Sequence, residues 1–343
     1  MNKLVEDILS ENLDIIKEIN FKELNGKTIL LTGASGLMGV HFLATVRNLV
    51  LNSSYNIKIY SICKSEPVEY FKSLSNFSGS SIIRGDITDI IFLNALPKAD
   101  FIIHAAGYGQ PGKFMDDQVK TLKLNTFSTF ELLNKLKTNG KFLFLSTSEL
   151  YSGLNNAPFN EKQIGNTNTD HPRSCYIEAK RCGEAIVNAY RKIGIEAKSA
   201  RLSLAYGPGT QKGDQRVLNS FIEKALKGNI HMMDDGKALR TYCYVSDAIN
   251  IMWQILLTGK DAIYNVGGKS KTSIKELAEI IASILNVKVI SPKDSQTLEG
   301  APENVYLDMT KVEKEFNKLK YISLKEGLLK TIEWQRELYL EKS

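Results

Sequence analysis

The amino-acid sequence predicts a doubly wound α/β fold, in which helices cover both faces of a parallel sheet. Five short segments that are apolar nearly throughout recur in the first 150 residues, and helix-length segments separate most of them. A strand is apolar on both faces when neither face meets water, as in a parallel sheet covered by helices. A glycine-rich turn directly follows the first apolar segment, which is typical of the opening βα unit of such a sheet.

The expected strands are short apolar runs bounded by turn residues. They lie at residues 27–33, 56–63, 81–85, 99–107, 141–148 and 195–206. A long helix is expected to begin around Ser174 and to precede the last strand. Beyond this strand the alternation becomes irregular, so we expect the regular sheet to end there.

A helical extension and a smaller lobe are expected on either side of the sheet domain. Residues 1–25 place apolar side chains at helix-compatible spacing, which predicts a packing arm before the sheet domain at 26–206. Residues 207–343 are expected to form mainly a second lobe, interleaved with the last strands. Two S-x-x-E capping boxes, Ser273–Glu276 and Ser323–Glu326, predict helices in this lobe. A ligand is expected in the cleft between the two lobes.

Composition excludes several classes of protein. The 343 residues include 44 Lys and Arg against 38 Asp and Glu, and the net charge of +6 is too small and scattered to predict a nucleic-acid surface. No apolar run approaches the roughly 20 residues that span a bilayer, so no membrane segment is expected. The four cysteines are far apart, without a CxxC pair, and the acidic start is unlike a signal peptide. We therefore expect a cytoplasmic location and no metal site.

The strongest local signal for a ligand is the segment Thr32–Gly39, TGASGLMG, which follows the first strand and opens a helix. Glycines there allow a sharp turn, a close approach of the backbone to a pyrophosphate and close packing of helix on strand. This arrangement predicts a Rossmann-type dinucleotide site. The residues expected to contact the dinucleotide in this turn are Gly33, Ser35, Gly36, Leu37, Met38 and Gly39.

Residues after the third and fourth strands complete the predicted cofactor site. Asp86, with Ile87, is placed to accept from an adenine amino group, although an Asp heading a helix is also a common N-cap. The fourth strand ends in Ala105, Ala106 and Gly107, whose small side chains leave room for a cofactor against the backbone.

Two basic residues nearby need separate interpretations. His104, beside the small residues, is expected to be a packed histidine rather than a ligand. Lys64 follows the second strand, where an NAD enzyme usually carries an acidic residue that holds the ribose hydroxyls. A lysine there favours a 2′-phosphate, so the sequence leaves NAD and NADP both open.

A catalytic pair is predicted on the long helix. Tyr176 and Lys180 are four residues apart and so share one helix face. The pKa of a free phenol is about 10, and an ammonium and a nicotinamide cation beside it would stabilise the phenolate as a base. Lys180 is also expected to hold the nicotinamide ribose. Thr147, at the end of the fifth strand, is expected to hydrogen-bond the hydroxyl that Tyr176 deprotonates, with capping as the alternative role.

Together these motifs resemble the extended short-chain dehydrogenase/reductase superfamily, and within it the nucleotide-sugar epimerases, dehydratases and decarboxylases. The resemblance covers roughly residues 26–335. The matching segments are TGASGLMG, GDITD, HAAG, LNT with Asn125, STSELY, RSCYIEAKR, YGPG, RTYCYVSDA and YNVGG. The resemblance implies Asn125 as a cofactor contact, and Thr147, Tyr176 and Lys180 as the catalytic trio with Glu149 as an assisting acid/base.

Within the superfamily, STSE followed by RSCYxxxKR is most similar to UDP-glucuronate decarboxylases. Sugar 4,6-dehydratases usually have Asp where Ser148 stands, and simple C4-epimerases usually lack an acid/base at Glu149. The resemblance therefore implies an NAD(P)-dependent enzyme that acts through a 4-keto sugar, with decarboxylation as the first expectation and C4-epimerisation, then 4,6-dehydration, as alternatives. A non-catalytic dinucleotide-binding regulator is the remote alternative.

The resemblance also implies contacts to a nucleotide-sugar substrate. These fall to Ser148, Arg173, Tyr206, Asn219 and Arg240, while Tyr108 with Gln110 would cover the nicotinamide or the sugar. Leu204 stands where relatives commonly carry an Asn near the diphosphate, so the pocket is expected to differ there. A homodimer is implied through helices around 113–137 and 174–193.

Overall fold

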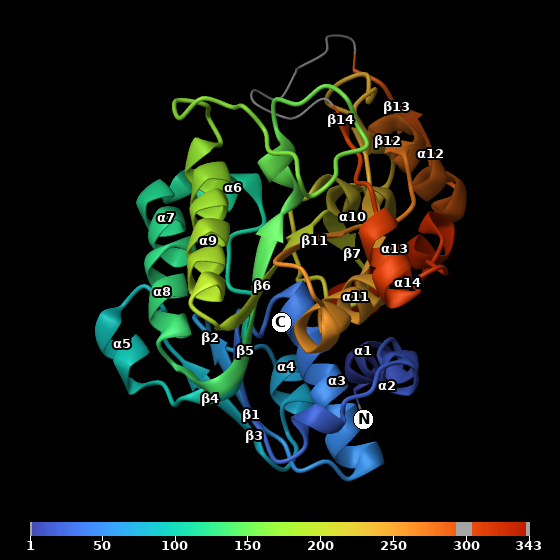
Figure 1. The fold of residues 1–343 in the computed structure, drawn as a ribbon. Coiled ribbons are helices and arrows are strands. Elements are labelled where there is room, and N and C mark those ends of the chain that lie inside the picture. Colours follow the sequence, from blue (N-terminus) through green and yellow to red (C-terminus); the bar gives the residue numbers. More distant parts are fainter. Residues whose placement is uncertain (1, 293–303, 341–343) are drawn as a thin grey trace.

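The computed structural model describes residues 2–292 and 304–340 (Figure 1). In this part of the chain the main sheet has seven parallel strands in the order β11-β6-β5-β4-β1-β2-β3. They are β1 (Thr28–Thr32), β2 (Lys58–Cys63), β3 (Ser80–Arg84), β4 (Ala99–His104), β5 (Leu136–Thr147), β6 (Glu196–Leu202) and β11 (Ile263–Val266). The predicted doubly wound α/β fold is confirmed.

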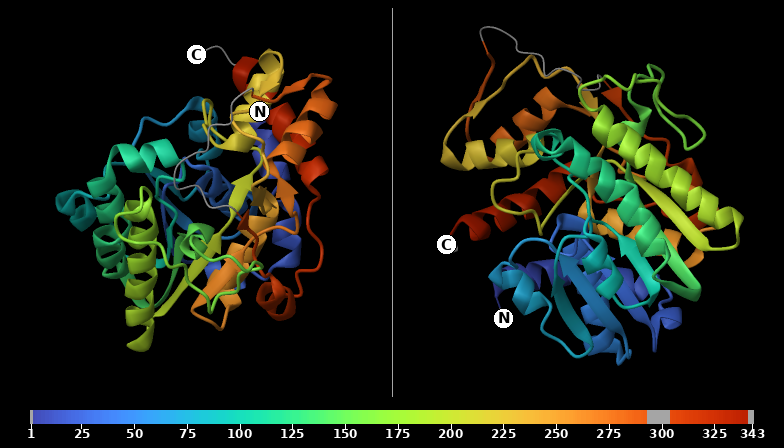
Figure 2. Two further views of the ribbon diagram at one scale, coloured as in Figure 1. Left: turned by 90° about the horizontal axis from the view of Figure 1, so that it is seen from above. Right: turned by 90° about the vertical axis from the view of Figure 1, so that its left-hand side faces the viewer.

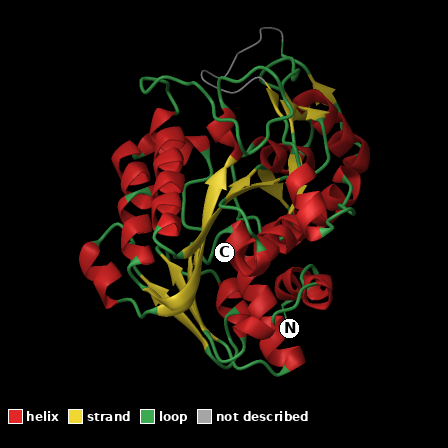
Figure 3. Ribbon diagram, viewed as in Figure 1, coloured by secondary structure: helices red, strands yellow, loops and turns green. Residues whose placement is uncertain are grey.

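Helices form a layer on each face of the sheet (Figures 2 and 3). One layer contains α3 (Leu37–Ser53), α4 (Glu69–Leu74) and α11 (Val245–Thr258), whose buried side chains share one apolar core. The other contains α5 (Ile90–Ala95), α8 (Phe127–Leu133) and α9 (Ser174–Lys192), which enclose a second core. Apolar residues on both faces of the strands are thus buried, as their sequence predicts.

The helix expected around 113–137 is broken. The structure gives α6 (Pro111–Asp116), α7 (Gln118–Asn125) and α8, and β5 already begins at Leu136. Asp117 has φ −134° and ψ 78°, outside the helical region, and its carboxylate accepts from the Lys120 N–H at 3.0 Å. The side chain therefore caps a new helix where the sequence suggests a continuous one.

The first residues form helices that are part of the core. These elements are α1 (Lys3–Ser10), α2 (Leu13–Glu18) and the 3₁₀ turn η1 (Lys22–Leu24). Leu4, Ile8 and Ile15 are buried, and Phe21 meets Trp253 of α11 edge to face at 5.3 Å between ring centroids. Edge-to-face contacts of this kind stabilise aromatic cores.

The second lobe is built from short strands and longer helices. Its strands are β7 (Leu204–Tyr206), β8 (Ile230–His231), β9 (Leu239–Arg240), β10 (Tyr242–Tyr244), β12 (Thr272–Ser273), β13 (Val289–Ile290) and β14 (Asn304–Val305), and its helices are α10 (Val217–Lys227), α12 (Ile274–Leu285), α13 (Thr310–Phe316) and α14 (Leu324–Leu340). The range predicted for this lobe includes residues 293–303 and 341–343, which lie outside the described residues. Ser273 and Glu276 form the predicted capping box, and at the other box the Glu326 N–H donates to Ser323 Oγ at 3.3 Å.

The strand expected at 195–206 divides between two sheets. β6 stays in the main sheet, whereas β7 pairs with β10. β11 then joins the edge of the main sheet beside β6. The regular sheet therefore extends beyond the end that the sequence predicts, because the seventh strand comes from a segment some 60 residues farther along the chain.

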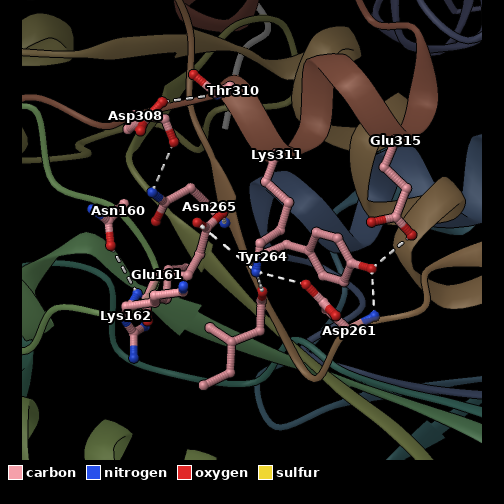
Figure 4. A network of polar contacts seen from close by, with 12 residues as sticks. Asn160, Glu161, Lys162, Asp261, Tyr264, Asn265, Asp308, Thr310, Lys311 and Glu315 are labelled. Carbon is pink, nitrogen blue, oxygen red and sulfur yellow. Dashed lines mark hydrogen bonds and ion pairs between the residues drawn. The ribbon is translucent and has the colours of Figure 1, made fainter.

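Polar contacts hold β11 in place (Figure 4). Asn265 donates from Nδ2 to the carbonyl oxygens of Phe159 at 2.9 Å and Asp308 at 3.0 Å, and its N–H donates to Glu161 Oε1 at 2.9 Å. Its Oδ1 accepts from the Tyr151 hydroxyl at 2.7 Å. One buried amide thus joins the seventh strand to the loop after β5 and to the start of α13.

His41 of α3 connects the N-terminal helices to the segment 207–216. Its Nε2 donates to the Pro208 carbonyl at 2.8 Å, and Nδ1 accepts from Asn12 Nδ2 at 2.9 Å. These partners require the neutral ring, because a second N–H would face an amide donor. Burial lowers the pKa of His41 to about 4.

We predict that His41 contributes to acid destabilisation. The unfolded chain binds a proton at His41 below about pH 6.5, whereas the folded protein resists it until about pH 4, so stability present above pH 6.5 is lost as the pH falls. Urea unfolding across this range should show a loss of about 3 kcal/mol from this group. The loss should be absent in His41→Gln and retained in His231→Gln, a change at an exposed histidine. Equal pH slopes in the wild type and His41→Gln would contradict the prediction.

Candidate active site

A cavity opens at the carboxyl ends of the central strands, where ligands of open α/β sheets bind. Most of the turn residues predicted to contact a dinucleotide line it, namely Gly33, Gly36, Leu37, Met38 and Gly39. All four residues predicted for catalysis line the same cavity, namely Thr147, Glu149, Tyr176 and Lys180. Ala105, Gly107, Tyr108, Gln110 and Ser148 do so as well. The fold therefore brings together residues that are more than 140 positions apart.

The turn after β1 has the geometry of a phosphate-binding loop. Gly33 has φ +66°, and a Cβ on it would lie 2.6 Å from the Ala106 nitrogen. A Cβ on Gly39 would lie 2.3 Å from the Gly33 carbonyl oxygen. Larger residues would push the turn away from β4 and α3, so the glycines keep the backbone amides exposed at the positive end of a 17-residue helix.

The residues at this edge fit a dinucleotide. Besides the glycine turn, Asn125 Oδ1 is buried and accepts no hydrogen bond from the described residues. It lies near Gly107, since a Cβ added to Gly107 would be 4.0 Å from Asn125 Oδ1 and 3.4 Å from Lys180 Nζ. A buried acceptor and an ammonium beside the same glycine suit the amide and ribose of a nicotinamide nucleotide.

Tyr176 and Lys180 project from α9 toward the end of β5. The Thr147 side chain hydrogen-bonds the Tyr176 hydroxyl. Lys180 Nζ donates to the Leu145 carbonyl at 2.6 Å and lies 6.0 Å from the centroid of the Tyr176 ring. The ring itself is stacked on Phe114 at 4.5 Å. The position of the phenol is therefore fixed by stacking on its ring and by a hydrogen bond to its hydroxyl.

Burial acts on the two ionisable groups in opposite directions. It raises the pKa of Tyr176 above its usual range, and the Glu149 carboxylate raises it further, against the effects of Thr147 and Arg216. Burial lowers the pKa of Lys180 to about 7, while Glu184 opposes that decrease. Without further positive charge, the phenol stays protonated at neutral pH.

Glu184 joins the same helix to the same strand. Its carboxylate accepts from the Ser146 hydroxyl at 2.6 Å and from two nitrogens of Arg201 on β6, at 2.8 and 2.9 Å. Leu145, Ser146 and Thr147 thus bond in turn to three side chains of α9. The sequence predicts Thr147, Tyr176 and Lys180 as site residues but none of these three contacts. It also does not predict the buried ion pair, although an acidic residue four positions after Lys180 is its signal.

Charged residues cluster where a sugar would lie. Arg173 donates to Glu149 Oε1 at 2.9 Å, while Glu149 Oε2 is buried and accepts no hydrogen bond within residues 2–292 and 304–340. Arg240 on β9 is half-buried, and its charge acts on both. Burial lowers the pKa of Arg240, and the positive charge of Arg173 contributes.

Asp86, expected at the adenine, contacts neighbouring polar side chains. The Asp86 carboxylate accepts from Lys120 of α7, from the Thr88 N–H at 3.0 Å and from Thr88 Oγ1 at 2.8 Å. Lys64 Nζ lies 3.5 Å from it. Burial disfavours the charged carboxylate, but the bonds from Lys120 and Thr88 outweigh it and hold the pKa of Asp86 below its usual range. The N-cap of α5 is Asp89 rather than Asp86, and Ile87 is buried beside this site.

Of the five residues expected at the substrate, Ser148 lines the cavity, whereas Arg173, Tyr206, Asn219 and Arg240 lie outside its lining. The Tyr206 hydroxyl donates to the Leu324 carbonyl at 3.4 Å. Asn219 on α10 accepts from Gln335 Nε2 at 3.1 Å.

His104 is the predicted packed histidine, hydrogen-bonded to Thr32 at 2.8 Å and to the Leu124 carbonyl at 3.1 Å.

The segment 207–216, which we call the strap, contributes lining residues that the sequence analysis misses. Gln211 donates to the Ser35 carbonyl of the glycine turn at 2.8 Å. The Gln215 N–H donates to Gln110 Oε1 at 3.2 Å. Asp214 and Arg216 form an ion pair at 2.6 Å and also line the cavity. The strap therefore spans the opening from the cofactor turn to the loop after β4.

Comparisons with known proteins agree with this geometry. The model of the NAD dependent epimerase/dehydratase family matches residues 29–267. UDP-glucuronic acid decarboxylase 1 of Danio rerio is 30% identical, over 92% of this chain and 74% of that protein. UDP-glucuronic acid decarboxylase 6 of Arabidopsis thaliana is 29% identical, over 88% of this chain and 86% of that protein.

Solved structures share the fold. UDP-glucuronic acid 4-epimerase from Bacillus cereus, in complex with UDP-glucuronic acid and NAD, superimposes with a TM-score of 0.77 at 24% identity, covering 91% of this chain and all of that one. The dTDP-glucose 4,6-dehydratase DesIV from Streptomyces venezuelae has a TM-score of 0.77 at 21% identity, covering 90% of this chain and 97% of that one.

We predict that Glu184→Gln strongly destabilises the protein. The change leaves the buried Arg201 guanidinium without its carboxylate, which costs about 3–5 kcal/mol in comparable buried pairs. Glu178→Gln is the matched control on the same helix, because Glu178 is half-buried and its pair with Arg181 at 3.0 Å lies near the surface. The control should lose less than about 1 kcal/mol. Urea unfolding measures both, and equal losses would contradict the role assigned to Glu184.

Proposed function

This chain belongs to the NAD-dependent epimerase/dehydratase family, and we propose that within this family it is a decarboxylase that converts UDP-glucuronate to a UDP-pentose. The observation that carries the proposal is the position of Tyr176, whose side chain lines the cavity that the glycine turn also lines. The similarity to UDP-glucuronic acid decarboxylases, over 88% to 92% of this chain, supports this choice of substrate. A regulator without catalysis would have no need of the Thr147, Tyr176 and Lys180 arrangement.

The first step is removal of a proton from the C4 hydroxyl of the sugar. The chemistry that the dinucleotide supplies when bound is acceptance of a hydride from C4 and its later return. Tyr176 takes the hydroxyl proton at its phenolic oxygen, and Thr147 shares the hydrogen bond that orients this oxygen. Lys180 adds a positive charge that favours the phenolate. General base catalysis of this kind contributes about 10²–10⁴ in rate.

The 4-keto sugar then makes decarboxylation easy. Its C6 carboxylate is β to the ketone, so the C5–C6 bond breaks and its electron pair moves toward the C4 carbonyl oxygen as carbon dioxide leaves. A proton added at C5 restores the ketone, and reduction at C4 completes a reaction without net oxidation. Glu149 is the acid/base nearest to this chemistry, and its Oε2 forms no hydrogen bond with the described residues.

Arginines near Glu149 suit a sugar that carries a carboxylate. Arg173 contacts Glu149 at 2.9 Å, and Arg240 is close enough for their charges to interact. A C6 carboxylate would share these two guanidinium groups with Glu149. Epimerisation at C4 is the second candidate, because the same 4-keto intermediate can accept the hydride on its other face. Dehydration is less favoured, since Ser148 provides no carboxyl acid.

Location and assembly follow from the surface and the thiols. All four cysteines are free, as in a reducing compartment, so we propose a cytoplasmic protein. Among the described residues no helix is both long and apolar enough to cross a bilayer.

An apolar patch on α6, α7 and α8 suits a second copy of the chain. Its exposed side chains are Met115, Val119, Leu122 and Phe130, beside small exposed residues of α9, Cys182, Ala185 and Ala189.

The proposed reaction is tested by product analysis. Incubation with UDP-glucuronate and either NAD or NADP should release carbon dioxide and a UDP-pentose with no net reduction of the dinucleotide, as followed by mass spectrometry and absorbance. A product of unchanged mass would instead identify an epimerase, and loss of water would identify a dehydratase. Tyr176→Phe should retain dinucleotide binding and lose about 10²–10⁴ of the turnover. Unimpaired turnover in this variant would overturn the role of Tyr176.

The proposed homodimer is tested by charging the apolar patch. Val119→Lys combined with Leu122→Glu should convert a dimer into a monomer in sedimentation velocity, because burying two charges costs more than the contact provides. Leu319→Lys, at a residue that is 70% exposed in the other lobe, should leave the dimer intact. A wild-type monomer, or a charged variant that stays dimeric, would be evidence against this interface.

A further inference from the structure

We propose that the adenosine end of the cofactor site holds a 2′-phosphate, so that this member of an NAD-dependent family favours a 2′-phosphorylated dinucleotide. The residues concerned are Lys64 and Lys120, with Asp86 between them. The inference rests on the proposed function only for the dinucleotide site, and it is independent of the sugar and of the reaction performed on it.

The first support is the position of Lys64. β1 and β2 run parallel, with Thr32 opposite Ile62, and the Ala34 N–H of the glycine turn donates to the Ile62 carbonyl at 3.1 Å. Cys63 and Lys64 therefore lie beside that turn. The acidic residue that binds the ribose hydroxyls in NAD enzymes occupies this place, next to the pyrophosphate. In this chain the buried thiol of Cys63 and the half-exposed ammonium of Lys64 lie there instead.

The second support is the balance of charge around this place. Glu66, the nearest carboxylate along the chain, pairs with Arg84 at 2.6 Å and lies 3.7 Å from Lys72. The other carboxylate, Asp86, contacts two lysines. The cluster thus contains two carboxylates and four cations, which are Lys64, Lys72, Arg84 and Lys120. The excess of two positive charges matches the charge of a phosphate dianion.

The third support is the arrangement of hydrogen-bond donors. An ammonium has three N–H donors, and the contact with Asp86 occupies only part of the capacity of Lys64 and Lys120. Asp86 fixes the two ammonium groups near each other while its own oxygens already accept from Thr88 and Lys120. A phosphate placed between the lysines would therefore meet donors rather than the carboxylate.

The test compares small fragments of the cofactor, so that its readout is binding and not turnover. Adenosine 2′,5′-bisphosphate and 5′-AMP are titrated into the full-length protein by calorimetry. The bisphosphate should bind at least ten-fold more tightly, and its advantage should shrink as salt is raised, because the added contacts are ionic. The isomeric adenosine 3′,5′-bisphosphate has the same charge and should lack most of this advantage, because its phosphate lies outside the subsite.

Matched variants locate the effect. Lys64→Met keeps most of the side-chain length and should reduce the preference for the 2′-phosphate to less than three-fold, with the affinity for 5′-AMP unchanged. Lys72→Met, in the same charged cluster but paired with Glu66, should preserve it. Equal binding of the 2′,5′ compound and 5′-AMP would overturn the proposal, as would equal binding of the two bisphosphates or an unaltered preference in Lys64→Met. Failure of the sugar reaction would affect none of these outcomes.

Discussion

The site depends on the attachment of one helix to the end of one strand. Three consecutive residues of β5, Leu145 to Thr147, each bond to a side chain of α9, and those side chains belong to Lys180, Glu184 and Tyr176. The bonds fix the rotation of α9 about its axis, which decides whether the phenol faces the cavity or the sheet. Because Arg201 of β6 neutralises Glu184, the attachment extends to a second strand and resists local opening.

This attachment also explains how two reactive groups can be kept inactive until they are needed. Burial favours the uncharged form of both Tyr176 and Lys180. The isolated protein therefore holds a neutral phenol next to an amine that is only partly protonated near pH 7. Positive charge brought into the cavity favours the phenolate and therefore activates the base when a ligand is present. Exclusion of water makes the coupling strong, because the charges act through protein rather than solvent.

The sequence predicts those parts of the fold that depend on residues close together in the chain. The strands, the turn from Thr32 to Gly39 and the Tyr176–Lys180 spacing depend on neighbouring residues, and a sequence displays these directly. Contacts between distant segments were not predictable in this way. Arg216, for example, reaches the cavity from a segment without periodicity. The break at Asp117 is local, but there a side-chain cap overrides an apparently continuous helical pattern. The packing of Tyr206 and Asn219 away from the lining depends on contacts with α14. The Ser323–Glu326 capping box indicates this helix, but no motif indicates those contacts.

The attachment of the strap to its neighbours has a consequence for the exchange of a bound nucleotide. Hydrogen bonds hold the strap in place. Gln211 bonds to the glycine turn, His41 of α3 bonds to the Pro208 carbonyl, and Trp334 of α14 donates to the Thr210 carbonyl at 2.8 Å. On the proposed function, a nucleotide bound beneath the strap would exchange only when several of these hydrogen bonds break together. A ketone that escapes before its hydride is returned would therefore strand the molecule in the reduced state. On the proposed function, the number of turnovers that each copy completes would then depend on how well the site retains the half-reacted sugar.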